Sequence, residues 1–246
     1  MNDNLTLSTN QSVKRLFNSK KSGHLIGILA VFLPFVTVAL IGDSLGTDIS
    51  FASALVINLA YLLAILIATV VLKSQGSGWR TLGLARPKSW PKTILMALGA
   101  LLALIAALLG FQIILMNIPG LALQPSDQSQ YNPLTGNLPM FLSAVAVAWT
   151  MVAFGEEMLF RAFLIAGLAG LFPNLKARWG LALAGSSLLF GLGHYDWGLA
   201  GIIETTIVGL ILGWIYLRSG QNLWVTIIAH ALINTLKFSL IYAGIV

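Results

Sequence analysis

Two adjacent carboxylates and a guanidinium stand inside a long apolar stretch of this chain. Glu156 and Glu157 lie just after the apolar run 138–154, and Arg161 precedes the wholly apolar run 162–172. Glu157 and Arg161 are four residues apart with the Glu on the N-terminal side, the favourable orientation for an ion pair on one helix face. Glu156 is turned about 100° away and lacks that partner. Charges at such depth point to function, and this spacing predicts one Glu held by Arg and a second Glu free for chemistry.

Two histidines and an asparagine lie in later apolar segments. His194 ends one segment, and His230 and Asn234 lie one helical turn apart in the last. Each alone is more often an inter-helix hydrogen-bonding group than a catalyst. Counted from the basic turns, Glu156, His194 and His230 come to similar depths, so we expect them to meet within the membrane. Glu156 would then take a proton from water, and His or Asn would donate to a developing oxyanion.

The composition is that of an integral, multi-pass membrane protein. Hydrophobic residues make up 57% of the chain and charged residues 9%, against about 25% charged in soluble domains. The net charge of +6 is spread over short loops, which fits membrane topology and predicts no nucleic-acid partner. The chain has no cysteine, which excludes disulfides, thiolate metal sites and thiol nucleophiles.

The apolar segments predict an all-α, polytopic transmembrane helical bundle of about seven spans. The segment 138–172 would be about 52 Å long as a single helix, against a hydrocarbon core of about 30 Å. It must therefore protrude, tilt or break, and it leaves room for an eighth span. The expected spans are 25–41, 51–72, 93–118, 138–172, 179–194, 198–217 and 223–242.

One membrane domain, 22–246, is expected after a polar tail, 1–21, that is disordered or lies on the membrane surface. Its first three spans occupy 22–118, and its catalytic core occupies 138–246. Lys and Arg gather in the tail and in alternate loops, which predicts a cytoplasmic N-terminus. The membrane is expected to be a bacterial cytoplasmic membrane. With seven spans, the C-terminus would lie outside.

Three short motifs lie in order on successive apolar segments: Glu-Glu-x-x-x-Arg (Glu156, Glu157, Arg161), Phe-x-x-x-His (Phe190, His194) and His-x-x-x-Asn (His230, Asn234). Together they resemble the CPBP family of intramembrane proteases, also called the CAAX-protease/bacteriocin-processing or Abi family. The resemblance covers about residues 138–238. It implies an all-helical protease that cleaves a peptide or lipidated protein substrate at the lipid bilayer, in the eukaryotic branch by removing the last three residues of prenylated CAAX proteins.

The resemblance also implies a role for each motif residue. Glu156 is the expected base, and Glu157 with Arg161 is the structural pair, with Phe190 in support. The water- and oxyanion-orienting groups are His194, His230 and Asn234.

The sequence leaves the use of a metal open. Two His and one Glu (His194, His230 and Glu156) match the ligand count of a catalytic zinc site, and the family is conventionally labelled metalloprotease. If Glu156 were a ligand, however, Glu157 would have to leave Arg161 to act as the base. We therefore favour a Glu-activated water, with zinc as the alternative and no other cofactor.

Two other function classes also fit intramembrane charges. One is a proton- or ion-coupled transporter, although the polar residues cluster on three spans and no inverted repeat is visible. The other is a catalytically idle immunity or scaffold protein with the same fold. Glu204, in the sixth expected span, belongs to none of the motifs, and we expect a structural role for it, either as the partner of a basic group or near the outer surface close to Asp196 and Trp197. Ser186 and Ser187 are interpreted as small packing residues.

Overall fold

The computed structural model describes residues 21–45, 51–117 and 124–245, with side chains assigned from residue 21 to 40 and again from 56. Helices and turns make up these ranges, and no strand occurs within them. The expected all-α polytopic bundle is therefore confirmed. The expected polar tail lies outside the described residues, apart from Lys21.

Most of the described residues lie in long helices. One of them, the composite helix 138–171, joins α5 (Leu138–Val147), η3 (Ala148–Val152), α6 (Ala153–Glu156), η4 (Glu157–Leu164) and α7 (Ile165–Leu171) without a break. Three short helices lie in the connections: η1 (Arg80–Leu84), η2 (Ser129–Leu134) and η5 (Tyr195–Trp197). The other long helices are α2 (Lys21–Leu45), α3 (Phe51–Ser74), α4 (Trp90–Asn117), α8 (Arg178–Leu192), α9 (Gly198–Arg218) and α10 (Leu223–Tyr242).

Six helical segments of the described chain are long and apolar enough to cross a membrane. The fifth expected span, 179–194, is not among them, because its helix α8 has only 15 residues, about 22 Å of helix against about 30 Å of hydrocarbon. It therefore ends partway, two residues before His194. The composite helix runs unbroken for 34 residues, so no eighth span is hidden in it, and it must tilt or protrude.

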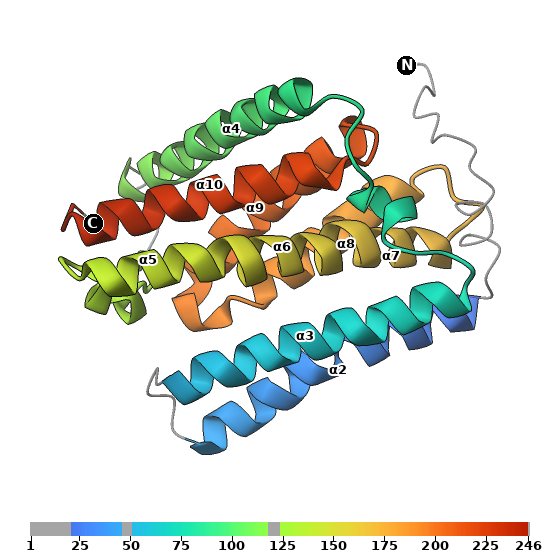
Figure 1. The fold of residues 1–246 in the computed structure, drawn as a ribbon, viewed down its shortest axis with the longest axis horizontal. Helices are drawn as coiled ribbons and strands as arrows, with labels where there is room; N and C mark the ends of the chain where they lie inside the picture. Colours follow the sequence, from blue (N-terminus) through green and yellow to red (C-terminus); the bar gives the residue numbers. More distant parts are fainter. Residues whose placement is uncertain (1–20, 46–50, 118–123, 246) are drawn as a thin grey trace.

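The composite helix occupies the middle of the molecule (Figure 1). The pair α2 and α3 packs on one side of it, α2 against α7 and α3 against η4. On its other side lie α8, α9 and α10, and α4 covers α10 and α9. Every residue of η4 is buried, which is why its charged side chains must find partners within the protein.

At the end of the bundle that carries the basic loops, η1 docks on the turn between α9 and α10. The Tyr216 hydroxyl donates to the Leu82 carbonyl oxygen at 2.9 Å. Gly83 has a φ of +99°, and a Cβ there would overlap the Gln221 carbonyl. Only glycine combines that left-handed backbone with so close an approach.

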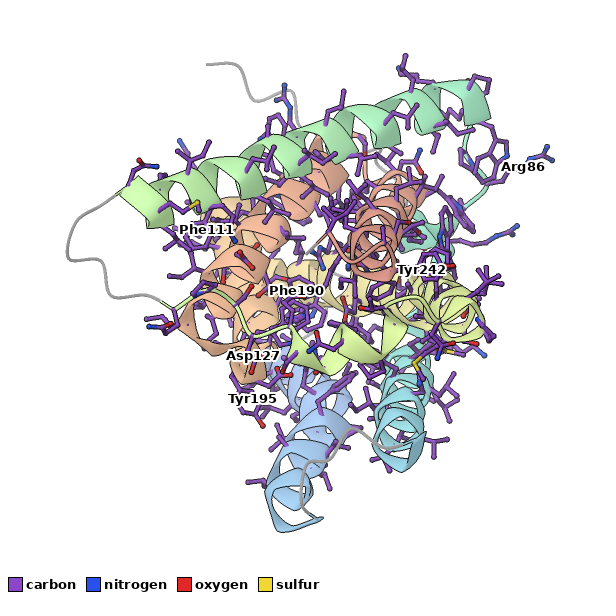
Figure 2. The ribbon with its side chains drawn as sticks, turned by 90° about the vertical axis from the view of Figure 1, so that its left-hand side faces the viewer. Arg86, Phe111, Asp127, Phe190, Tyr195 and Tyr242 are labelled. Carbon is purple, nitrogen blue, oxygen red and sulfur yellow. The ribbon has the colours of Figure 1, made fainter. Side chains whose placement is uncertain are left out.

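The opposite end joins the loops that lack Lys and Arg. The Asp127 amide donates to the Trp197 carbonyl oxygen at 3.1 Å, and the Gly136 amide donates to the Tyr242 carbonyl oxygen at 3.0 Å. Asp127 and Tyr195 lie near each other at this end (Figure 2). The described loops of the two predicted sets thus lie at opposite ends of the bundle, as alternation across a membrane requires.

Candidate active site

The two adjacent glutamates lie where the composite helix changes its winding. Glu156 ends the α-helical segment α6, and Glu157 begins the π-helical segment η4. Wider π-type turns are frequent at functional sites because they re-aim side chains within a helix. Both carboxylates are buried, with 4% of Glu156 and none of Glu157 exposed.

Glu157 is held by two cationic or donating partners. Its Oε1 lies 3.1 Å from Arg161 Nη1 and 2.9 Å from His230 Nδ1. The Arg161 guanidinium also covers the Phe190 ring at 4.3 Å from the ring centroid, a favourable cation–π arrangement. The structure therefore forms the ion pair that the four-residue spacing predicted, and it adds an imidazole to it.

Glu156 is held less tightly than its neighbour. Its Oε1 accepts a hydrogen bond of 2.7 Å from the Tyr61 hydroxyl. Its Oε2 lies 3.6 Å from His230 Nε2, beyond hydrogen-bonding distance, and has no hydrogen-bond partner among the described residues. Glu156 thus keeps one carboxylate oxygen uncommitted.

His230 stands between the two glutamates and links them. A carboxylate of a salt bridge accepts hydrogen bonds, so Nδ1–H of His230 donates to Glu157. In the neutral ring this tautomer leaves Nε2 as an acceptor that faces Glu156. Glu156, Glu157, Arg161 and His230 form one connected unit, which we call the central cluster.

His194 approaches the central cluster from the break after α8. Its Nδ1 lies 2.9 Å from the Phe190 carbonyl oxygen, and a carbonyl can only accept, so Nδ1 carries the proton and Nε2 of the neutral ring is the acceptor. The His194 ring contacts the Phe190 ring with centroids 4.9 Å apart, and the Phe190 ring lies 6.2 Å from that of His230. Phe190, at the middle of the bundle (Figure 2), therefore connects both histidines and Arg161.

Asn234 lies one turn beyond His230 on α10 and is half-buried. Within the described ranges its side chain makes no hydrogen bond to the central cluster. The structure thus gathers the other motif residues, Glu156, Glu157, Arg161, Phe190, His194 and His230, and leaves Asn234 beside them on the same helix face.

The described residues do not form a ready-made metal site. In the part of the chain that the structure describes, no three His, Cys, Asp or Glu side chains are grouped as a metal site requires. His194 and His230 each direct Nδ1–H to an acceptor and keep Nε2 free, so these hydrogen bonds do not themselves decide between water activated by Glu156 and zinc. We therefore derive no step of the reaction through a metal.

Tyr61 is a site residue that the motifs did not reveal. It comes from α3, in the part of the chain outside the three motifs, and it packs edge-on against Phe35 with ring centroids 4.8 Å apart. The single tyrosine of α3, in a mostly aliphatic helix, is the signal that the sequence offers. Its partner, Glu156, is 95 residues away in the chain.

Glu204 belongs to a separate cluster near the start of α9, at the end of the bundle away from the basic loops. Its Oε1 accepts from Gln112 Nε2 at 2.5 Å, and its Oε2 accepts from Ser126 Oγ at 2.8 Å. We call these three residues the Glu204 cluster. Because both oxygens are bonded by neutral donors that join α4, α9 and the loop before η2, the expected structural role fits this geometry.

The serines make packing contacts. Ser186 Oγ donates to the Phe160 carbonyl oxygen, and Ser187 Oγ donates to the Leu183 carbonyl oxygen, each at 2.8 Å. These hydrogen bonds tie α8 to η4 and Ser187 to its own helix. Neither serine hydroxyl is bonded to a histidine, as a nucleophile would need to be.

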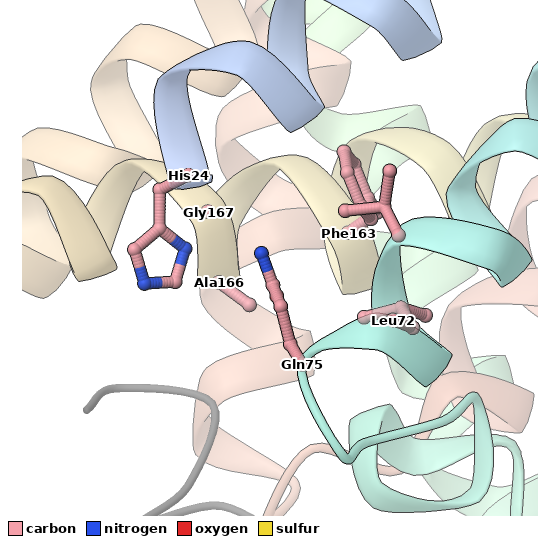
Figure 3. A pocket seen from close by; sticks show the side chains of 7 residues that line it. His24, Leu72, Gln75, Phe163, Ala166 and Gly167 are labelled. Carbon is pink, nitrogen blue, oxygen red and sulfur yellow. The ribbon is translucent and has the colours of Figure 1, made fainter. Parts of the chain in front are cut away.

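A small hollow lies elsewhere, at the basic-loop end between α2, α3 and α7 (Figure 3). It is lined by His24, Val71, Leu72, Gln75, Phe163, Ala166 and Gly167. The lining contains no carboxylate and no residue of the three motifs. It is therefore a packing feature apart from the central cluster.

Comparison with known proteins gives one family. Residues 138–236 match the family model described as Type II CAAX prenyl endopeptidase Rce1-like, and all three motifs lie within that range. No match is found among curated proteins or solved structures. The family match confirms the resemblance for this segment and supports an intramembrane endopeptidase.

Proposed function

We propose that this chain, whose segment 138–236 is that of the CAAX protease family, hydrolyses peptide bonds with a water activated by Glu156. One observation carries the proposal: a buried carboxylate with a free oxygen stands beside an imidazole whose other nitrogen is fixed by an ion-paired carboxylate. In that arrangement Glu156 can accept a proton, while Glu157 keeps the His230 ring in position beside it.

The reaction needs one base and a route for one proton. The water oxygen adds to the scissile carbonyl carbon while Glu156 takes a water proton, which gives a tetrahedral oxyanion. When this intermediate collapses, the C–N bond breaks and the proton passes from Glu156 to the leaving amine. Glu157 keeps the His230 ring oriented throughout, and Arg161 balances the charge of Glu157.

The hydrogen bonds of the two polar side chains suggest different roles. His194 Nδ1–H donates to the Phe190 carbonyl oxygen. In the neutral ring, Nε2 is therefore the acceptor, and it can orient the attacking water. The Asn234 amide has donors to spare and suits the oxyanion. An oxyanion donor of this kind commonly contributes about 10²–10³ in rate.

The substrate is proposed to be a membrane-bound peptide or lipidated protein, of the CAAX or bacteriocin-precursor kind. The family description supports this class, and the site lies in a bundle of apolar helices that a lipidated segment can approach through the bilayer. A cytoplasmic N-terminus in a bacterial membrane completes the proposal. Reporter fusions at residue 85 should then read internal, and fusions at residue 130 should read external.

The decisive experiment compares purified wild type with Glu156→Gln on a library of prenylated and unmodified peptides, with and without chelator. The substitution removes the base but keeps its shape, so cleavage should fall by about 10²–10⁴ while the protein stays folded. Asp127→Asn makes the same chemical change at an exposed position and should cleave normally. Wild-type rates for Glu156→Gln would disprove the assigned base, and loss of cleavage with chelator would favour the zinc alternative.

A further inference from the structure

The two histidines of the proposed site are held by different means. Nδ1 of His230, on α10, is fixed by the Glu157 carboxylate, whereas in the described part of the chain no carboxylate forms an ion pair with His194. His194 also follows the end of α8 with φ −113° and ψ 32°, so it lies in a turn and not on a helix. Apart from its hydrogen bond to the Phe190 carbonyl oxygen, the orientation of this imidazole depends on the rings that it contacts.

Trp197 supplies one of these ring contacts. Its ring meets the His194 ring edge-on, with centroids 4.7 Å apart and planes at 69°. The Phe190 ring makes the other contact, at 4.9 Å and 63°, and aromatic pairs favour this edge-to-face geometry. The Trp197 amide donates to the His194 carbonyl oxygen at 3.1 Å, so the backbone turn itself brings the two side chains together. Two rings and one hydrogen bond thus hold the imidazole and leave its Nε2 free.

Trp197 is itself anchored by several segments. The Tyr131 ring of η2 lies 6.3 Å from it, and Lys237 Nζ of α10 lies 4.2 Å from its ring centroid. Its carbonyl oxygen accepts from the Asp127 amide at 3.1 Å. Gly201 of α9 leaves room for the side chain, since a Cβ there would overlap that of Trp197. Because three segments besides its own fix the indole, it can keep the neighbouring imidazole in place.

Resting on the proposed proteolysis, we propose that Trp197 is a positioning residue that acts through His194. It holds the imidazole in the orientation in which Nδ1–H bonds to the Phe190 carbonyl oxygen and Nε2 can accept a hydrogen bond from the attacking water. Misalignment of such a group slows the chemical step, because the reacting atoms must be held in register. Loss of Trp197 should therefore lower kcat and leave KM nearly unchanged.

The first test measures cleavage of one peptide by wild type and three variants. Trp197→Leu removes the ring and should lower kcat by about 2- to 10-fold, the range that an edge-to-face ring pair supplies. Trp197→Phe keeps an aromatic ring and should retain most of kcat. Gly201→Ala keeps both rings but displaces the indole, so it should act like Trp197→Leu, and it serves in its place if Trp197→Leu does not fold. Trp214→Leu, which changes an exposed tryptophan at the basic-loop end of α9, should cleave normally.

A double-mutant cycle separates positioning from a general structural role. With His194→Gln already present, Trp197→Leu should not lower the residual kcat further, because Trp197 acts only through the imidazole. Equal losses in the two backgrounds would overturn the proposal with proteolysis standing. Wild-type kcat in Trp197→Leu would overturn it as well.

NMR of isotope-labelled histidine tests the same contact without turnover. The chain has only three histidines, and His194→Gln identifies which signal belongs to His194. Wild type and Trp214→Leu should show the Nδ1–H tautomer at His194, and Trp197→Leu should show a mixture of the two tautomers. An unchanged tautomer in Trp197→Leu would overturn the role of Trp197. A mixture of tautomers in Trp197→Leu, with no cleavage of any peptide by wild type, would retain that role and reject the protease.

Discussion

The molecule buries carboxylates in two clusters that are built from opposite kinds of partner. In the central cluster, Glu157 is neutralised by the full charge of Arg161 and further bonded by His230. In the Glu204 cluster, the carboxylate receives only the neutral donors Gln112 and Ser126. An ion pair neutralises a carboxylate inside a dry bundle. Hydrogen bonds from neutral groups hold a carboxylate in place but leave its negative charge uncompensated.

The comparison also shows which carboxylate is available for chemistry. Both oxygens of Glu204 are engaged, and so is the charge of Glu157. Glu156 and Glu157 each accept one hydrogen bond and each keep an oxygen that has no partner in the described structure, but only Glu157 is ion-paired with Arg161. A base must be able to accept a proton, so Glu156, the carboxylate that is neither ion-paired with Arg161 nor bonded at both oxygens, is the one that we propose as the base.

The largest expected effect is the loss of stability when Arg161 is removed from the central cluster. Arg161→Ala leaves Glu157 as an uncompensated buried charge, which should lower the free energy of unfolding by about 3–5 kcal/mol. Thermal unfolding in detergent measures the loss. Glu157→Gln/Arg161→Met, which removes both charges and keeps the volume, should recover part of it. A variant Arg161→Ala as stable as wild type would reject the structural role of the pair.

An intermediate effect is expected in the other cluster. Glu204→Ala leaves two half-buried neutral donors unpaired, at a cost of at most about 1–3 kcal/mol, which is smaller because no charge is stranded. Glu204→Gln keeps an acceptor oxygen and should lose less. The same unfolding measurement compares both with Arg161→Ala. If Glu204→Ala were the more destabilising of the two, the distinction between charged and neutral partners would fail.

Much of this architecture could be predicted from the sequence, because in a membrane each apolar run must become a helix. The expected span 223–242 coincides with α10, and 198–217 differs from α9 by one residue. The expected segment 179–194 differs from α8 by only one or two residues at each end; the error was to count so short a helix as a membrane span. Within one helix, spacing was sufficient to pair Glu157 with Arg161.

Contacts between distant segments could not be predicted in this way. The periodicity of the sequence does not predict that Tyr61 of α3 donates its hydroxyl to Glu156, or that Lys237 lies among aromatic rings from η2 and η5. These contacts depend on how helices pack, and packing is set by the shapes of many side chains together. The sequence thus identified the charged residues of the site but missed Tyr61, which approaches Glu156 from elsewhere in the chain.

The smallest effect is expected at Tyr61, and it tests how Glu156 is held. Tyr61→Phe keeps the ring that packs against Phe35 but removes the hydroxyl that donates to Glu156 Oε1. A hydrogen bond to a charged group contributes about 1.5–3 kcal/mol at most, and only the part that serves the transition state affects rate. We therefore expect kcat to fall by about 10-fold or less, with KM and thermal stability nearly unchanged. Tyr61→Leu, which removes both the hydroxyl and the ring, should lose stability as well as kcat, so a fall in kcat without a loss of stability in Tyr61→Phe would identify positioning of the base. A Tyr61→Phe protein with wild-type kcat would show that Glu156 is held by His230 and the helix alone, and the contrast between its two oxygens would then have no catalytic meaning.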